Sequence, residues 1–388
     1  MSQDVPGNLL DEIRILRSPK GYLYAGLPKF RALFGRDSII SSIQLIDLFP
    51  DIAQNTVIYL KDLQGRKLDY SIGEYPGKIL HEYYDDEKIF LDRKRSIPWL
   101  NSRINYFSVD STPLFILLIK NLFLRNLIDI EQFKDSIMMA MQFLIAYSSS
   151  DGLITYDKAL LGAGLMSQSW RDGVGDIMDR LKSPVATVGV QGYFYESADF
   201  VLNLFPDSLI EESLPDLKDF YSKMREILEN KFWLEETGYY GLAVDGDGVI
   251  EQAATSDPGH LIGSGILTRS RERDVIDRLF ESDLLTDYGI RTLSAKDPRF
   301  DPKAYQRGSI WPQDNWIIAD GIKRRGYLKE YRELRERLIA AYEYYGRMPE
   351  YFGVDRYGKI MDLSKLRIKP CYPQAWSTGA IINFVTFK

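Results

Sequence analysis

Helical periodicity runs along nearly the whole chain and limits its possible folds more than any other feature. Apolar residues return at spacings of three and four, whereas the two-residue alternation typical of a half-buried strand is scarce. The clearest segments with this spacing are 37–49, 111–127, 130–147, 190–205, 214–233, 309–326 and 329–345. The sequence therefore predicts an all-α fold.

The starts of the helices show a second regularity. Six helices have a polar or Gly/Pro-rich approach followed by small or aromatic residues, and they begin near Asp37, Asp110, Thr187, Pro258, Gly308 and Pro373. These starts are roughly 50 to 77 residues apart, with no sequence identity between the units. Between most of them lies a helix with a charged face, such as those beginning at Ile130, Leu214 and Lys329.

Six alternations of a buried helix with a more solvated one predict six helical hairpins in a closed ring. We expect an (α/α)6 barrel, a six-hairpin toroid, whose inner helices begin at one end; the alternative is an irregular all-α domain. A length of 388 residues alone favours two or three domains. No Pro/Ser-rich linker or low-complexity tract divides the chain, so residues 1–388 are predicted to form a single domain.

Charge and cysteine content narrow the class of protein. The formal net charge of −6, from 49 basic and 55 acidic residues, argues against a nucleic-acid partner bound through a positive face. The single cysteine, Cys371, permits no internal disulfide and fits a reducing compartment. The first residues lack an apolar signal core, and no apolar run is long enough to span a bilayer. We expect a cytoplasmic protein without a membrane partner; the sequence does not determine its oligomeric state.

Residues 167–176, SQSWRDGVGD, place Trp170 beside Asp172 in a stretch too polar for core, where a helix could begin. Helix capping is the ordinary explanation for Asp37, Ser111 and Ser309 at such positions. Capping does not explain the other large polar and aromatic residues of these approaches, which are Arg36, Trp170, Gln191, Trp311, Gln313 and Trp376. These loops are therefore candidates for a ligand site.

Nine short motifs follow one another in a family-like order. They are LFGRDS (33–38), EYPGKILHE (74–82), YFSVDSTPLF (106–115), SWRDG (169–173), VQGYFY (190–195), YGIRTLS (288–294), GSIWPQDN (308–315), MPEYFG (348–353) and YPQAWSTGA (372–380). Together they resemble the amylo-α-1,6-glucosidase catalytic domain of glycogen-debranching enzymes and their relatives, which share an (α/α)6 barrel with glucoamylase-like hydrolases. The resemblance covers nearly the whole chain and implies a glycoside hydrolase acting on a carbohydrate.

Glycoside hydrolysis needs a carboxylic acid that protonates the leaving oxygen and a second carboxylate across the sugar. The resemblance places the acid at Asp172. Trp170 and the neighbouring glycines would exclude water there, which raises the pKa of the carboxyl, and the indole would stack on a sugar. The alternative reading of Asp172 is a helix cap or a partner of Arg171.

The resemblance places the general base at Glu350, in a Pro- and Gly-flanked loop after a long helix. The alternative is an ordinary exposed loop carboxylate. If both assignments hold, the two carboxyl groups should lie about 6.5–9.5 Å apart, which leaves room for water and gives inversion of the anomeric configuration. A gap of about 5 Å would instead indicate a retaining enzyme.

Further residues are predicted to bind the substrate. Arg36 and Asp37 match an Arg-Asp pair that grips hydroxyls of the terminal sugar, with a capping Asp and a buried ion pair as the alternative. For Asp110 an N-cap role competes with sugar contact, and for Trp311 and Trp376 a place in the core does. The full set of predicted substrate-binding residues is Arg36, Asp37, Glu82, Asp110, Trp170, Arg171, Gln191, Trp311, Gln313, Asp314, Gln374 and Trp376.

The chain departs from the family pattern at three places. Gly189 stands where relatives usually have glutamate, residues 305–307 read Tyr-Gln-Arg where Tyr-His-Asn is common, and Gln313 replaces a histidine. These changes affect the expected sugar contacts and put debranching specificity in question.

Other chemistries fit the sequence less well. His81 and His260 are the only histidines and do not have metal-ligand spacing, so neither a metal nor a cofactor is expected. The GDGDG-like stretch at 245–248 reads as a turn. We expect an inverting, exo-acting α-glycosidase that cleaves α-1,6 or α-1,4 glucans, oligosaccharides or small α-glucosides. Alternatives are a phosphorylase or epimerase on the same barrel, or an inactive glycan-binding homologue.

Overall fold

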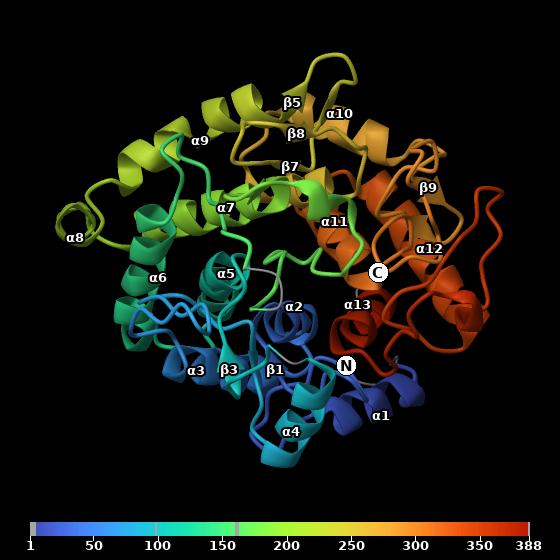
Figure 1. Cartoon of the computed structure of the whole chain (residues 1–388), viewed down its shortest axis with the longest axis horizontal. Helices are drawn as coiled ribbons and strands as arrows, with labels where there is room; N and C mark the ends of the chain where they lie inside the picture. Colours follow the sequence, from blue (N-terminus) through green and yellow to red (C-terminus); the bar gives the residue numbers. More distant parts are fainter. Residues whose placement is uncertain (1–4, 98, 160–162, 387–388) are drawn as a thin grey trace.

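The computed structural model describes residues 5–97, 99–159 and 163–386. An inner ring of helical elements surrounds the middle of the molecule (Figure 1). The inner elements are α2 (Gly35–Leu45), α5 (Ser111–Leu124), α7 (Val188–Leu204), η3 (Asp257–Ser264), α11 (Pro312–Arg324) and α13 (Ala375–Thr386). Each packs on the next in chain order, and α13 packs on α2, which closes the ring.

Outer helices lie around this ring (Figure 1). They are α1 (Gly7–Leu16), α3 (Pro50–Asp62), α6 (Lys134–Ala146), α9 (Leu217–Phe232), α10 (Arg269–Leu279) and α12 (Leu328–Tyr345). Each packs against one or two inner elements. The (α/α)6 barrel predicted from the sequence is therefore confirmed.

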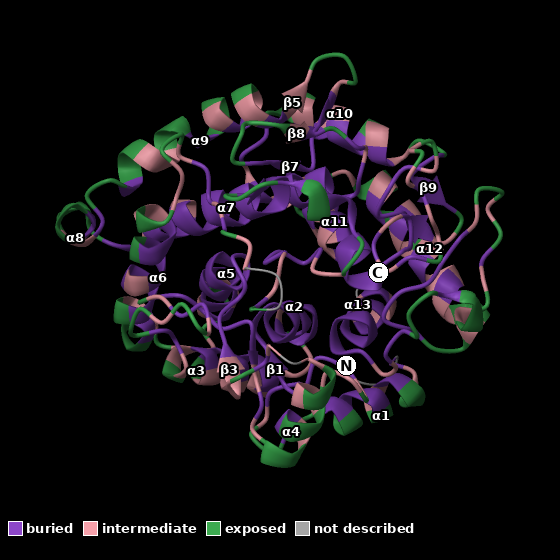
Figure 2. Ribbon diagram, in the orientation of Figure 1, coloured by how far each residue is buried: buried purple, intermediate pink, exposed green. Residues whose placement is uncertain are grey.

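Burial follows from how each helix sequence is patterned (Figure 2). Helix α5, STPLFILLIKNLFL, is apolar on nearly every side and is buried along most of its length, as an inner helix must be. Helix α9 instead buries a single stripe, formed by Leu217, Met224, Leu228 and Phe232, and turns its charged residues outward. Among the described residues, no helix is long and apolar enough to cross a membrane.

Smaller elements fill the connections. These are α4 (Glu87–Ser96), α8 (Asp207–Ser213), η1 (Ile130–Phe133), η2 (Ile177–Arg180) and η4 (Leu363–Lys365). In the described part of the chain, ten two-residue strands form four small antiparallel sheets. They are β1 (Leu33–Phe34), β2 (Glu82–Tyr83) and β3 (Ile104–Asn105); β4 (Ala186–Thr187), β7 (Ala243–Val244) and β8 (Ile250–Glu251); β5 (Trp233–Leu234) with β6 (Tyr239–Tyr240); and β9 (Leu285–Thr286) with β10 (Gly289–Ile290). Strand β1 runs directly into α2 and β4 into α7, so the small sheets hold the entries of inner helices.

Most predicted helices end within a few residues of the observed ones. The segment 130–147 divides into η1 and α6, and the inner element predicted near Pro258 is only a short 3-10 helix. It ends at Gly265, whose φ of 81° is in the left-handed region that stops a helix. Helices α1, α3 and α10 were not among the predicted segments, because their apolar stripes are narrow.

The capping explanation fails where it was offered. The N-cap positions of α2, α5 and α11 are Phe34, Asp110 and Trp311, and none of their side chains makes a capping hydrogen bond. Asp37 lies inside the first turn of α2 instead. The predicted turn at 245–248 is confirmed, because the Asp245 carboxylate accepts hydrogen bonds from the backbone amides of Asp247 and Val249.

Candidate active site

The inner helices begin at one end of the barrel, which we call the front end. Contacts between first-turn residues establish this: Arg36 of α2 bonds Asp110 at the start of α5, and Gln374 before α13 bonds Asp37. The candidate residues Arg36, Asp37, Asp110, Gln313, Asp314, Gln374 and Trp376 are all buried at these helix starts.

Arg36 connects two carboxylates across the front end. Its Nη1 donates to both oxygens of Asp110 at 2.9 Å, and its Nη2 donates to Asp172 Oδ2 at 2.9 Å. Ser108 also donates to Asp110, at 2.7 Å. Asp110 is fully buried, whereas the side chain of Asp172 keeps a quarter of its surface exposed. Arg36 therefore holds Asp172 in place with one carboxylate edge open.

The loop that carries Asp172 is fixed on both sides by Gln306. The Gln306 amide donates to the backbone oxygen of Trp170 at 2.6 Å and accepts from the backbone N–H of Gly173 at 2.9 Å. Arg171 also anchors this loop, because its Nε donates to the Asp257 carboxylate. The residue that departs from the family pattern at 306 therefore positions the loop of the candidate acid.

Burial raises the pKa of Asp172 above its usual value, the positive charge of Arg36 opposes this rise, and the negative charge of Asp110 adds to it. The net direction is upward. A raised pKa keeps a larger fraction of this carboxyl protonated as the pH approaches neutrality, which a proton donor requires.

Glu350 is held by backbone pairing and by two donors. Phe352 pairs with Ile310, the residue before the α11 entry, and this brings the 348–353 loop to the front end. The Cys371 amide donates to Glu350 Oε2 at 2.7 Å, and the Tyr305 hydroxyl donates to Oε1 at 2.5 Å. Burial raises the pKa of Glu350, these two hydrogen bonds lower it, and the charge of Asp172 raises it further, with a net upward shift.

Tyr305 lies between the two carboxylates. It bonds Glu350, and its ring packs so closely on Gly173 that an added Cβ there would stand 2.5 Å from Cδ1. The pKa of Tyr305 is raised by burial and by the negative charges of Glu350 and Asp172. The structure thus brings Asp172 and Glu350 to one end of the barrel, as predicted, rather than to separate surfaces; their separation of about 6.5–9.5 Å stays a prediction.

Asp37 is a third carboxylate beside this pair. Burial raises its pKa to about 8 in spite of Arg36, and the charges of Asp172, Glu350 and Asp110 add to the rise. At neutral pH this carboxyl is largely protonated, so it can donate a hydrogen bond as well as accept one.

Several buried polar atoms at the front end have no hydrogen-bond partner within the described residues. They are Arg36 Nε, both amide atoms of Gln313, Asp314 Oδ2, Gln374 Oε1, Trp376 Nε1 and the hydroxyls of Thr187, Thr255 and Ser256. Buried polar groups in folded proteins are otherwise almost always paired. This set of donors and acceptors fits a ligand with many hydroxyl groups. The sequence did not single out the three hydroxyls, because Ser and Thr at helix entries have an ordinary capping role.

Other predicted contact residues have structural roles instead. The Gln191 amide is used entirely by Ile154 and Thr187. Arg171 is fully buried with all its nitrogens bonded to protein atoms, and the Trp311 indole donates to Tyr305 and packs flat on Tyr351. Because no polar group of these three is free for a sugar, we correct the prediction and leave them out of the proposed site.

Trp170 and Glu82 have polar groups that are already bonded to other side chains. The Trp170 indole donates to Asp257 at 2.8 Å and is buried, so it contributes to the dry surroundings of Asp172. The Glu82 carboxylate is occupied by Tyr84 and Asn105, which agrees with a supporting position.

His260 is a residue that the sequence analysis considered only as a metal ligand. Its Nε2 is 2.7 Å from Asp314 Oδ1, and its Nδ1 is 2.7 Å from the Tyr193 hydroxyl. A Cβ at Gly189 would lie 3.3 Å from the His260 ring. Gly189 thus makes room for the imidazole where relatives carry glutamate. Among the described residues, no group of three or more His, Cys, Asp or Glu side chains could hold a metal ion.

A hollow of about 230 Å³ opens beside the candidate acid. Gly173, Tyr305 and Gln306 line it, together with Arg307 and Arg367. Both arginines pair with the single carboxylate of Asp301, at 3.7 and 2.6 Å. Asp176 also lines the hollow and pairs with the fully buried Arg171. The two arginines therefore form a positively charged wall of a hollow that also has an acidic side chain.

Comparison with known proteins relates the chain to glycoside hydrolases. Residues 166–355 match the family model of the mannosylglycerate hydrolase MGH1-like glycoside hydrolase domain. Mannosylglycerate hydrolases MGH1 and MGH2 of Selaginella moellendorffii are each 42% identical to this chain over 40 residues, which are 10% of this chain and only 8% of theirs.

Solved structures match over nearly the full length. Mannosylglycerate hydrolase of family GH63 from Thermus thermophilus, in complex with Tris and D-glycerate, superposes with a TM-score of 0.71 at 13% identity, covering 97% of this chain and 98% of that one. The same enzyme in complex with glucose gives a TM-score of 0.68 at 14% identity, with the same coverage. The solved structures show the fold that the chain shares with this hydrolase, and the family model covers 166–355; neither is a match to a debranching enzyme.

Proposed function

We propose that this hydrolase cleaves small glycosides with inversion, using Asp172 as general acid and Glu350 as general base. The observation that carries the proposal is that Tyr305 contacts both positions at the front end. Its hydroxyl bonds Glu350, and its ring packs on Gly173, the residue after Asp172. Asp172 would protonate the leaving oxygen, and Glu350 would take a proton from the attacking water. Protonated Asp37, Gln313, Asp314 and Gln374 would bind hydroxyls of the terminal sugar.

The proposed substrate is an α-glycoside of a small hydroxy acid, similar to mannosylglycerate. The leaving group departs beside the acid, into the hollow whose wall includes the cationic side chains of Arg307 and Arg367. A carboxylate on the leaving group would be attracted there. The relatives that are mannosylglycerate hydrolases, and the D-glycerate held by the Thermus thermophilus enzyme, support this choice.

A second candidate is hydrolysis of α-glucosides, the specificity implied by the debranching-like motifs. The glucose complex of the Thermus thermophilus enzyme favours a glucose-sized pocket. Both candidates use the same acid and base, so they differ only in the sugar and in the leaving group.

A substrate panel separates the two. We expect kcat/KM for α-mannosylglycerate or α-glucosylglycerate to exceed that for the methyl glycosides, maltose and isomaltose, and proton NMR to show the β-anomer as first product. Arg307→Gln should lower kcat/KM for the glycerate glycoside about tenfold, the size of one charge-assisted hydrogen bond, and spare the methyl glycoside. Lys365→Gln, an exposed neighbour, is the control. A preference for isomaltose would overturn the proposed substrate, and an α-anomer as first product would overturn the proposed inversion.

A further inference from the structure

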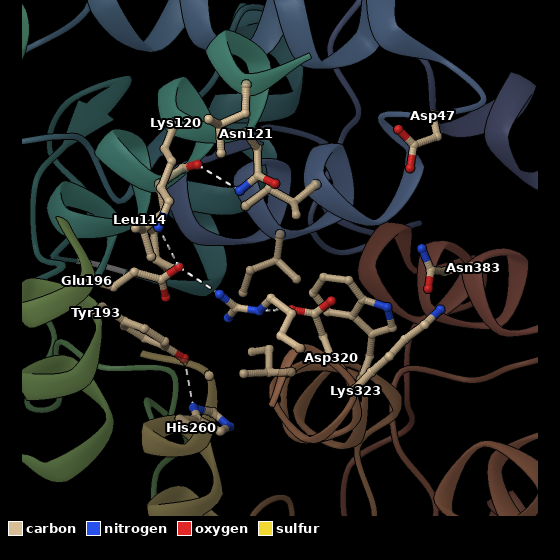
Figure 3. Close-up of a pocket in the computed structure, with 18 of the residues that line it drawn as sticks. Asp47, Leu114, Lys120, Asn121, Tyr193, Glu196, His260, Asp320, Lys323 and Asn383 are labelled. Carbon is tan, nitrogen blue, oxygen red and sulfur yellow. Dashed lines mark hydrogen bonds and ion pairs between the residues drawn. The ribbon is translucent and has the colours of Figure 1, made fainter. Parts of the chain in front are cut away.

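A larger cavity lies at the opposite, rear end of the barrel. It has a volume of about 610 Å³ and is lined by later turns of the inner helices, including Ile43 of α2, Lys120 of α5 and Lys323 of α11 (Figure 3). Lys323 is nine residues beyond Asp314, which corresponds to about 13 Å along the helix. We call this cavity the rear chamber; its wall towards the front end includes His260, which bonds Asp314.

Most charges around the rear chamber are neutralised within the protein. Glu196 accepts from Lys120 at 3.1 Å and from Arg324 at 2.7 Å, and Arg324 also pairs with Asp320 at 2.8 Å (Figure 3). At the edge, Asp47 pairs with Arg125. These ion pairs leave little free charge for a ligand.

Lys323 is the exception. Its ammonium bonds the Tyr331 hydroxyl at 3.5 Å and lies 4.8 Å from that ring, and it has no carboxylate within ion-pair distance in the described part of the chain. Asp320, which pairs with Arg324, interacts with Lys323 from beyond ion-pair distance. A half-buried ammonium without a directly paired carboxylate lowers the free energy of an anion bound beside it. The rear chamber therefore has an excess of one positive charge.

The rest of the lining suits a small polar molecule with an apolar body. Ile40, Leu114, Leu117 and Trp316 form apolar walls. Asn383 also lines the chamber, and its amide nitrogen is bound to Gln44, which leaves the carbonyl oxygen to accept from a hydroxyl. The volume lies within the range of ordinary small-molecule sites.

We propose that the rear chamber is a second binding site, for a hydroxylated carboxylate of monosaccharide size. Lys323 binds the carboxylate, Asn383 accepts from a hydroxyl, and the C–H face of the ligand packs on Trp316. The site does not depend on the reaction assigned to the front end, because the three residues assigned to the ligand, Lys323, Asn383 and Trp316, have no role in that reaction. His260, which bonds Asp314, forms another part of the chamber wall.

Fluorine NMR with 5-fluorotryptophan tests the proposal, using D-gluconate as the probe. The six tryptophans give separate signals, and those of Trp316 and Trp376 are assigned from Trp316→Phe and Trp376→Phe. We expect gluconate to shift the Trp316 signal. Lys323→Gln should weaken this binding about tenfold, whereas Lys323→Arg and the exposed-lysine control Lys329→Gln should retain it.

Three outcomes would overturn the proposal. Gluconate that shifts only the Trp376 signal binds at the front end alone. Unchanged affinity in Lys323→Gln would remove the assigned contact. Equal affinity for uncharged D-glucitol would show that no carboxylate is recognised. Hydrolysis by Lys323→Gln at the wild-type rate shows that the variant is folded, so loss of gluconate binding is then specific.

Discussion

The two ends of the barrel differ in how their charges are paired. At the front end, Arg36 is shared by two carboxylates, and several buried polar atoms have no hydrogen-bond partner among the described residues. At the rear end, Glu196 is paired with two cations, and the walls of the chamber are apolar. The difference is visible in the pKa values. Burial raises those of Asp37, Asp172 and Glu350, while at Glu196 two cations outweigh burial and lower the pKa. The buried carboxyl groups of the front end thus reduce the stability of the fold but are suited to proton transfer. The ion pairs at the rear end stabilise the fold.

The largest effect is expected from the two proposed catalytic carboxylates. Asp172→Asn and Glu350→Gln should each lower kcat by about 10³-fold or more, because proton transfer acts only in the transition state. Sugar affinity measured by calorimetry should stay nearly unchanged. Glu343→Gln, on the exposed side of α12, should keep full activity. Turnover near the wild-type rate in Asp172→Asn would remove that residue from the mechanism.

Asp37→Asn should separate activity from stability. We expect activity to fall about 10²-fold through loss of sugar contacts. Between pH 3.8 and about 8 the folded chain keeps a proton that the unfolded chain releases, so Asp37 reduces stability as the pH rises. The variant should therefore have a higher Tm than wild type, by a margin that grows from pH 5 to pH 8 in calorimetry. A margin independent of pH, or one shared by Asp11→Asn, would contradict the raised pKa.

Tyr305→Phe tests the link to the base. The hydrogen bond from Tyr305 lowers the pKa of Glu350, so its removal should raise that pKa. The acidic limb of the kcat/KM–pH profile should then move up by about one pH unit. Tyr357→Phe, at an exposed site, serves as the matched variant. An unmoved acidic limb would show that this hydrogen bond does not govern the base.

The smallest change in activity is expected at the rear end. Glu196→Gln leaves Lys120 and Arg324 without their carboxylate and should lower the free energy of unfolding by about 1–2 kcal/mol, with solvent screening taken into account. Because the folded pKa of Glu196 is lowered, this loss should be full at neutral pH and shrink below pH 4.5. Hydrolysis should be unaffected. A large fall in kcat would show that the two ends are not independent.

Much of the fold could be predicted from the sequence, because apolar periodicity reports directly on burial. Helix α5 is apolar on all sides and was expected as an inner helix, whereas η3 is too short to leave a clear period. Among the site residues, motif order led to Asp172 and Glu350. Motif order did not distinguish residues that contact a ligand from buried residues that support the structure. Gln191 and Arg171 bond only to protein atoms, and this could not be predicted because their partners lie far along the chain.

Residues 305 and 306 have a consequence for how proteins with this fold can diverge. Tyr305 contacts Glu350 and the glycine after Asp172, and Gln306 bonds the backbone on both sides of Asp172. Two consecutive residues therefore fix the positions of the proposed acid and base relative to each other. Under the proposed mechanism, helix packing can change over evolution without altering the anomer produced, provided that these two residues keep their contacts.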